Sequence, residues 1–182
     1  MTGPRSAVSA HLTTSLLPPG SLLEKYQCDG AYADCYVTEL AGRISHAEYA
    51  EAFYTTFLFK IERRLLALFV SKPSTDDQAR QLAAGTLDSF AAWSVEARAT
   101  DQLLMCDFQS RTRSWLMIAA GEVGGAESTR LYFGSAVVPI VSIKTGTRSM
   151  GPVFRLLLGL HKLYSRALLS AARSRLARQR RQ

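Results

Sequence analysis

The sequence contains no apolar run of the roughly 18 residues that a membrane-spanning helix requires. Its longest apolar stretches, residues 65–70 and 136–141, are much shorter. Residues 1–20 also lack the apolar segment of a secretory signal, because Ser, His and Thr interrupt the stretch 7–17. We therefore expect a cytoplasmic protein without a transmembrane segment.

Cysteine is scarce, and the chain contains only Cys28, Cys35 and Cys106. Their odd number and the lack of a C-x-x-C spacing argue against a disulfide framework and against a zinc site. No second histidine or carboxylate stands at metal-ligand spacing from His161. We expect reduced thiols, no metal and no cofactor. A catalytic pair of Cys35 and His161 is a weaker alternative, because no catalytic cysteine motif accompanies it.

Acidic residues are absent from the C-terminal end, where positive charge gathers. Apolar residues make up 47% of the chain and charged residues 20%, which is ordinary for a globular protein. Most of the formal net charge of +7 comes from the final arginines, which could contact anionic lipid or nucleic acid. The alternative is a solvated helix end, where arginine suits the helix dipole. These arginines are Arg173, Arg175, Arg178, Arg180 and Arg181.

The first half of the chain indicates a strand followed by helices. Residues 32–40 are rich in β-branched and aromatic side chains, which is typical of a strand. Ser45 and Glu48 fit the S-x-x-E capping box, so we expect a helix from His46. The pattern predicts one mostly buried helix, or a pair broken near residues 55–56, and then a short helix over 76–84. The apolar face of the helix, or helix pair, that begins at His46 consists of Tyr49, Phe53, Phe57, Ile61 and Leu65, continued by Leu68 and Phe69.

The second half of the chain predicts an antiparallel meander and a long terminal helix. Strands are expected over residues 90–99, 102–108, 113–120 and 129–139, because short turn-like connections separate them. A helix is expected from residue 153 to about 178. We divide the chain into a flexible N-terminal arm (1–29), a single domain (30–178) and a basic end (179–182).

This order of elements predicts an α+β fold, in which a curved antiparallel sheet wraps around the long C-terminal helix and a helix or helix pair follows the first strand. Over residues 30–175 it resembles the START/Bet v 1-like (SRPBCC, helix-grip) superfamily. The sequence shows fewer strands than that superfamily usually has, and residues 87–99 or 138–143 could hold the others. The end of the chain also resembles uncharacterised bacterial families within the superfamily, on Pro139 and the runs Phe154-Arg155-Leu156-Leu157 and Gly159-Leu160-His161.

The resemblance implies a ligand cavity between the sheet and the C-terminal helix. If one face of the strands turns toward that helix, apolar side chains with few polar groups would form a concave site for a small molecule. The alternative is a filled core built from the same residues. The expected lining is Trp93, Met105, Trp115, Met117, Phe133, Leu157, His161 and Tyr164.

His161 is the main candidate for chemistry, because it interrupts an apolar face of the expected C-terminal helix. It could contact a ligand or transfer a proton, although a hydrogen-bonded core histidine is the simpler interpretation. Glu96 and Asp107 are the candidate carboxylate partners, because burial of either would raise its pKa. A solvated position is the alternative for both.

Three functions are therefore considered. The first is binding of a hydrophobic or amphipathic molecule, such as a lipid, polyketide or isoprenoid-like compound. The second is an enzyme with cyclase- or hydratase-like acid–base chemistry in the same pocket. The third is an interaction module that docks through the arginine-rich end. Fold resemblance alone does not choose among them.

Overall fold

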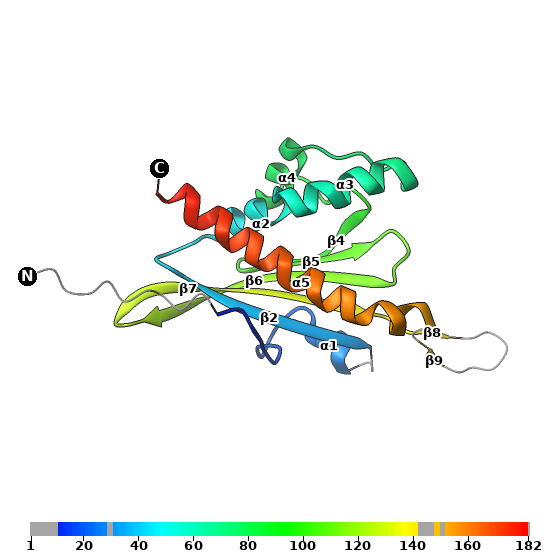
Figure 1. The fold of residues 1–182 in the computed structure, drawn as a ribbon, viewed down its shortest axis with the longest axis horizontal. Helices are drawn as coiled ribbons and strands as arrows, with labels where there is room; N and C mark the ends of the chain where they lie inside the picture. The colour runs from blue at the N-terminus through cyan, green and yellow to red at the C-terminus, as the bar shows by residue number, and fades with distance from the viewer. Residues whose placement is uncertain (1–10, 29–30, 142–147, 150–151, 182) are drawn as a thin grey trace, which may run out of the picture.

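The computed structural model has an α+β architecture, in which a long helix, α5 (Pro152–Gln179), crosses one face of a curved, open antiparallel sheet (Figure 1). It describes residues 11–28, 31–141, 148–149 and 152–181. For residues 28, 66, 69–70, 140–141, 148–149 and 152–158 only the backbone is described.

The main sheet has seven strands in the order β1-β2-β7-β6-β5-β4-β3, and all neighbours are antiparallel. The expected strands are present, and two short strands extend the sheet at its edges. The strands are β1 (Thr13–Thr14), β2 (Tyr32–Ala41), β3 (Ser89–Phe90), β4 (Trp93–Ala99), β5 (Gln102–Asp107), β6 (Thr112–Val123) and β7 (Ala126–Val137). A separate two-stranded sheet pairs β8 (Ile140–Val141) with β9 (Arg148–Ser149).

The helices that follow β2 begin as predicted. The capping box of Ser45 and Glu48 starts α2 (His46–Tyr54), because each residue satisfies the other's backbone N–H. The chain breaks after α2 at residues 55–56 and continues as α3 (Phe57–Val70). Thr75 caps α4 (Asp76–Ala83) in the same way. The remaining helix, α1 (Glu24–Cys28), precedes β2.

The break between α2 and α3 changes which face of the second helix is buried. Tyr49 and Phe53 of α2 are fully buried, as expected. In α3 the described part of the predicted buried stripe is instead exposed, because the break rotates the helix. The side chain of Phe69 lies outside the described residues. Leu58 and Phe59 now face the core. The exposed residues are Phe57, Ile61, Leu65 and Leu68.

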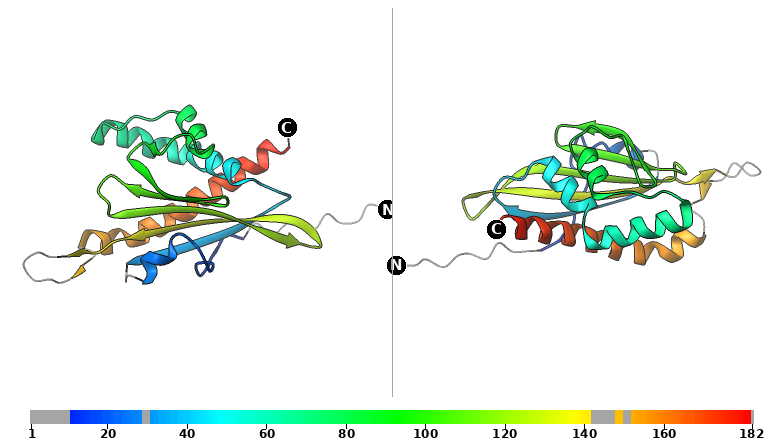
Figure 2. Two further views of the ribbon diagram at one scale, coloured as in Figure 1. Left: turned by 180° about the vertical axis from the view of Figure 1, so that it is seen from behind. Right: turned by 90° about the horizontal axis from the view of Figure 1, so that it is seen from above.

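Both faces of the sheet are covered (Figure 2). The inner face carries residues such as Tyr36 and Phe133 and packs against α2, α4 and α5 in one large apolar cluster. The outer face carries Trp115 and Tyr132, among others, and packs against the segment 11–28. We expected residues 1–29 to form a flexible arm, but the part described, residues 11–28, lies on the sheet. Thr13 and Thr14 pair with β2, and Leu17, Leu22 and Leu23 pack in this second cluster.

A β-bulge in β4 alters the expected alternation of its side chains. The pairing with β5 shifts between Val95 and Ala97, so one extra residue is inserted there. Val95 packs on the inner cluster and Ala97 on the outer cluster. Regular alternation over the expected strand 90–99 would put Trp93, Val95 and Ala97 on one face, and this expectation is wrong beyond the bulge.

The helix α5 is confirmed close to its predicted bounds, and its C-terminal half is attached to β2. Leu168, Leu169 and Ala172 are buried against the inner cluster. Arg173 Nε donates to the Glu39 carbonyl at 3.0 Å. Farther along, the guanidinium of Arg180 donates to the carbonyl groups of Ala41, at 2.8 Å, and Arg43. Two of the five terminal arginines therefore hold the helix against β2 and the loop after it.

Candidate functional site

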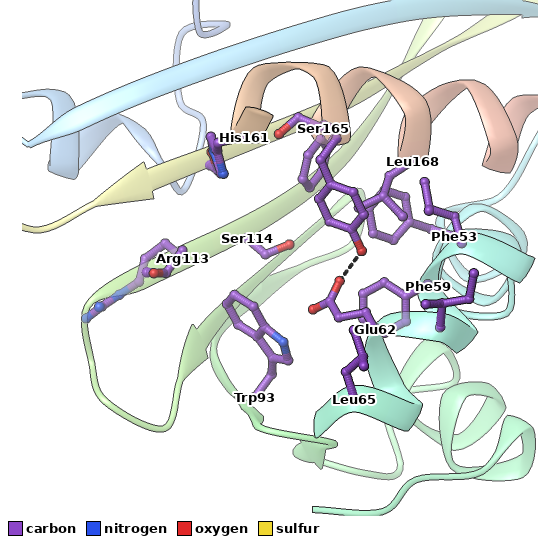
Figure 3. Close-up of a pocket in the computed structure, with 16 residues that line it drawn as sticks. Phe53, Phe59, Glu62, Leu65, Trp93, Arg113, Ser114, His161, Ser165 and Leu168 are labelled. Carbon is purple, nitrogen blue, oxygen red and sulfur yellow. Dashed lines mark hydrogen bonds between the residues drawn. The ribbon is translucent and has the colours of Figure 1, made fainter. Parts of the chain in front are cut away.

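A cavity of about 310 Å³ lies between the inner face of the sheet, α3 and α5 (Figure 3). Its walls are mostly aromatic and aliphatic, with a few polar groups that converge on it. Pockets of this character are the usual binding sites for small molecules. The lining residues are Phe53, Leu58, Phe59, Ile61, Glu62, Leu65, Trp93, Thr112, Arg113, Ser114, Phe133, Ser135, His161, Tyr164, Ser165 and Leu168.

One wall of the cavity carries a carboxyl group on α3. The hydroxyl of Tyr164 donates a hydrogen bond to Glu62, which Figure 3 marks with a dashed line. Burial among protein atoms raises the pKa of Glu62, and this effect outweighs the hydrogen bonds from Tyr164 and Trp93, which lower it. Glu62 therefore holds its proton to a higher pH than an exposed glutamate does.

Another wall carries His161, which two strands hold in place. His161 Nε2 lies 2.7 Å from Ser135 Oγ on β7 and 3.7 Å from Asp34 Oδ2 on β2. Ser135 Oγ lies 2.6 Å from Asp34 Oδ1, to which it donates its single hydrogen. It must then accept from His161, so Nε2 is assigned the proton.

This arrangement differs from that of a hydrolytic triad. In a triad the histidine accepts the proton of the serine, and the aspartate orients the other ring nitrogen. Here Asp34 binds Ser135 directly. It also accepts hydrogen bonds from the hydroxyl groups of Tyr32 at 3.2 Å and Tyr36 at 3.4 Å. Ser135 therefore positions the imidazole of His161 at a cavity whose walls are mostly apolar.

A further polar group in the lining is the hydroxyl of Ser165. Ser165 is buried on α5, yet its Oγ has no hydrogen-bond partner among the described residues. Burying a hydroxyl without a hydrogen-bond partner costs free energy. A bound molecule that gave Ser165 Oγ such a partner would therefore gain affinity.

Four of the eight residues expected to line a cavity do so. Trp93, Phe133, His161 and Tyr164 all belong to its walls. Met105 lies within the inner apolar cluster and is fully buried away from the cavity. The side chain of Leu157 lies outside the described residues.

Trp115 and Met117 lie on the outer face, against the prediction that they share a face with Met105. The pairing of β5 with β6 places Met105 opposite Ser114, so the inner face receives Ser114 and the outer face its neighbour Trp115. Gly134 of β7 leaves the space in which the indole sits, because a Cβ there would lie 2.9 Å from Trp115 Cε3.

Neither candidate carboxylate points into the cavity. Glu96 lies on the outer face, where it contacts Lys25 at 2.6 Å, Tyr26 at 2.5 Å and Arg113 at 2.7 Å. Burial alone would raise its pKa, but hydrogen bonds from these three donors outweigh burial and hold the pKa of Glu96 below its usual range. Asp107 Oδ1 accepts from the backbone N–H of Arg111 at 2.7 Å and thereby closes the turn between β5 and β6.

Cys35 and His161 do not form a pair. Cys35 belongs to the outer cluster, whereas His161 faces the cavity. Burial, with a smaller effect of the charge of Asp34, raises the pKa of the Cys35 thiol to about 12. A thiol with so high a pKa is a poor nucleophile near neutral pH.

Two carboxyl groups at or near the site were not among the sequence candidates: Glu62, which lines the cavity, and Asp34, which bonds to Ser135 beside His161. Glu62 is the single acidic residue of α3 and lies one turn from the inward-facing Leu58. Asp34 lies between Tyr32 and Tyr36 on one face of β2. For Glu62 the available signal was a single acid among the apolar residues of α3, and for Asp34 it was an acid between two tyrosines on one face of β2.

The comparisons with known proteins leave the family open, because no family model matches the sequence and no significant match was found among the curated proteins. None of the described helices is both long enough and apolar enough to cross a bilayer. Over the described ranges, no three His, Cys, Asp or Glu side chains gather as a metal site would require. The cavity thus combines mostly apolar walls with the carboxyl group of Glu62, whose pKa burial raises, and the imidazole of His161.

Proposed function

We propose that this chain is a helix-grip protein of the START/Bet v 1-like kind, which binds a hydrophobic or amphipathic small molecule between its sheet and α5. The observation that carries the proposal is the apolar cavity of about 310 Å³ between the sheet, α3 and α5. The antiparallel sheet crossed by a terminal helix supports the superfamily. Lipids, polyketides and isoprenoid-like compounds are the chemical classes that suit such walls.

The volume favours a compact ligand. Ligand pockets commonly measure about 300–1,000 Å³, and this cavity lies near the lower limit. A fused-ring or short branched molecule fits that space better than a lipid with two acyl chains.

The polar groups favour a ligand that is neutral and carries a hydroxyl or carbonyl group. Ser165 offers an unused hydroxyl, and His161 offers an imidazole. A ligand carboxylate would lie near the carboxyl group of Glu62, and Arg113, the arginine of the lining, is already paired with Glu96, which disfavours an anion at this position.

The first test is native mass spectrometry of the freshly purified full chain, followed by organic extraction. A stoichiometric adduct that denaturation releases would support the proposal, and its mass would identify the ligand class. If no adduct co-purifies, the chain should bind 1-aminoanthracene, a neutral aromatic probe. Energy transfer from Trp93 on the cavity wall to the probe would report this binding.

A matched pair of variants locates the binding site. Ser114 lines the cavity, so Ser114→Leu should fill it and weaken probe binding by about tenfold or more. Ser94 is exposed on β4, so Ser94→Leu should bind the probe as the parent chain does. A clean apo mass together with equal probe binding by both variants would reject the proposal.

The second candidate function is acid–base catalysis in the same cavity. It is favoured by Glu62 and His161, which enter from α3 and α5 and line one apolar space (Figure 3). Glu62 would donate a proton to the ligand while His161 accepts one from it, so the protein and the ligand gain no net proton. The extracted ligand should then exchange a C–H hydrogen with D₂O, and His161→Ala should stop the exchange but leave binding intact. Exchange that continues in this variant would exclude the role of His161.

A further inference from the structure

A second pocket of about 310 Å³ lies at the turn that joins β3 to β4. The segment between α3 and α4 and the residue that follows β5 form its other sides. Its lining is more polar than that of the cavity, and two of its side chains, Lys72 and Phe108, are exposed. The pocket is therefore open to solvent, and it offers both apolar surface and a positive charge.

Trp93 connects this second pocket with the cavity. Among the described residues it is the one that lines both spaces. It is the first residue of β4, and its side chain packs against the inner apolar cluster, where it is partly buried. The two spaces therefore meet at Trp93.

The other part of the boundary is a pair of stacked rings. Phe59 lines the cavity and Phe90 lines the second pocket, and their ring centroids are 6.2 Å apart with nearly parallel planes. Both rings are buried, and both also contact the ring of Tyr54, at 5.0 and 5.5 Å. Because close packing fixes these rings, Trp93 is the less constrained part of the boundary.

The indole of Trp93 is held in place from α3. It lies beside Glu62 (Figure 3), to which it donates a hydrogen bond. The same carboxyl group accepts the hydrogen bond of Tyr164 from α5. An apolar chain that extends from the cavity toward the turn between β3 and β4 would therefore meet an indole with a fixed orientation.

We propose that Trp93 determines the length of the ligand, because its indole closes the cavity against the second pocket. The proposal rests on the proposed ligand-binding function and deepens it. A compact ring compound fits on the cavity side of the indole, whereas a fatty-acid-like chain with an anionic end needs both spaces. Without the indole, such a chain would extend into the second pocket, where Lys72 offers its carboxylate a positive charge.

The test compares two fluorescent probes, compact and neutral 1-aminoanthracene and elongated, anionic dansylaminoundecanoic acid. The parent chain should bind the first and bind the second only weakly. Trp93→Ala should bind the second probe about tenfold more tightly or better, since burial of about two further methylene groups accounts for that change. The emission of each probe is recorded directly, because this variant lacks the tryptophan of the cavity wall.

The matched control is Leu58→Ala. Leu58 lines the cavity and is partly buried, but it does not line the second pocket. Its replacement enlarges the cavity without joining the two spaces, so the affinity for the dansyl probe should stay within about twofold of the parent's.

Two further variants test the second pocket and guard against misfolding. Lys72→Gln, added to Trp93→Ala, should weaken binding of the anionic probe by up to about fivefold, as loss of an exposed ion pair does. If Trp93→Ala does not fold, Trp93→Leu keeps an apolar side chain on the inner cluster and should show a gain in the same direction.

The two probes separate this inference from the proposed function. Equal affinity of the parent and Trp93→Ala for the dansyl probe, or equal gains in Trp93→Ala and Leu58→Ala, would overturn the role of Trp93. If the parent still binds 1-aminoanthracene in either case, the cavity assignment stands. Failure of the parent and of every variant to bind either probe would reject the proposed ligand-binding function itself.

Discussion

The hydroxyl of Tyr164 on α5 donates a hydrogen bond to the carboxyl group of Glu62 on α3, and this bond spans the two helices that border the cavity. Burial raises the pKa of Tyr164, and the adjacent carboxyl group of Glu62 raises it further. The tyrosine therefore remains a proton donor over the whole range in which Glu62 titrates. Within this pair, Glu62 is therefore the group that changes its protonation state in that pH range.

Stability should depend on pH through Glu62. Between pH 4.5, the ordinary pKa of glutamate, and the raised pKa of Glu62, the folded chain retains a proton that the unfolded chain has lost. The free energy of unfolding therefore decreases as the pH rises through this window. Glu62→Gln keeps an acceptor for Tyr164 but does not titrate. Its stability relative to the parent should grow from pH 4.5 upward, as urea unfolding at a series of pH values would show. A difference that is constant with pH would contradict this.

Two buried serines at the cavity should respond differently to replacement by alanine. Ser135→Ala removes the hydroxyl that links Asp34 to His161 and should cost about 1–3 kcal/mol. Ser165→Ala removes a hydroxyl with no partner among the described residues and should be neutral or stabilising. Urea unfolding of the two variants measures the contrast. A Ser135→Ala variant as stable as the parent would mean that the Asp34–Ser135–His161 network contributes no stability.

Gly134 should not tolerate a side chain. A Cβ at this position would lie 2.9 Å from the Asp34 carbonyl oxygen, from Leu23 Cδ2 and from Trp115 Cε3. Overpacking of this kind typically costs about 1–3 kcal/mol, which we expect for Gly134→Ala in thermal unfolding. Gly159→Ala is the control, because nothing lies within 4 Å and an alanine in a helix is favoured over glycine by about 0.5–1 kcal/mol. It should therefore raise the midpoint of unfolding.

Gln102 should be required to hold the N-terminal segment on the outer face. Its Oε1 accepts from Leu22 N at 2.8 Å and from Trp115 Nε1 at 2.9 Å. Gln102→Leu leaves both donors without this acceptor, at about 1–3 kcal/mol each, and should alter the tryptophan fluorescence. Gln109→Leu, at an exposed turn, should change neither property. Unchanged fluorescence in Gln102→Leu would show that Trp115 does not depend on this hydrogen bond.

The order of elements could be predicted because local signals determine it. The capping boxes at Ser45 and Thr75 start helices where expected, since each satisfies backbone donors within four residues. The α+β class follows from that order. Whether the fold belongs to the superfamily that it resembles is a separate question, and it stays a proposal.

The site was harder to predict, because side-chain direction depends on long-range pairing. One bulge reverses the direction of Ala97, and the pairing of β5 with β6 directs Trp115 away from the cavity. The break before Phe57 likewise turns a predicted buried stripe outward. Neither the bulge nor the pairing of β5 with β6 leaves a trace in residue spacing. The break was an alternative in the sequence analysis, but the spacing does not show how it turns α3. Trp93, Phe133, His161 and Tyr164 could be assigned to the cavity because their elements are regular around them.

In α5 the side chains around residues 168–176 are more buried than those around residues 159–164. Leu160 and Leu163 near the cavity are exposed, whereas Leu169 and Ala172 are fully buried and the arginine contacts follow. Amide hydrogen exchange should therefore be faster around residues 159–164 than around 168–176. A helix with such a gradient can open locally at the cavity while its other half keeps the sheet folded. Ligand exchange would then require only a partial unfolding event, with a free energy well below that of the whole chain.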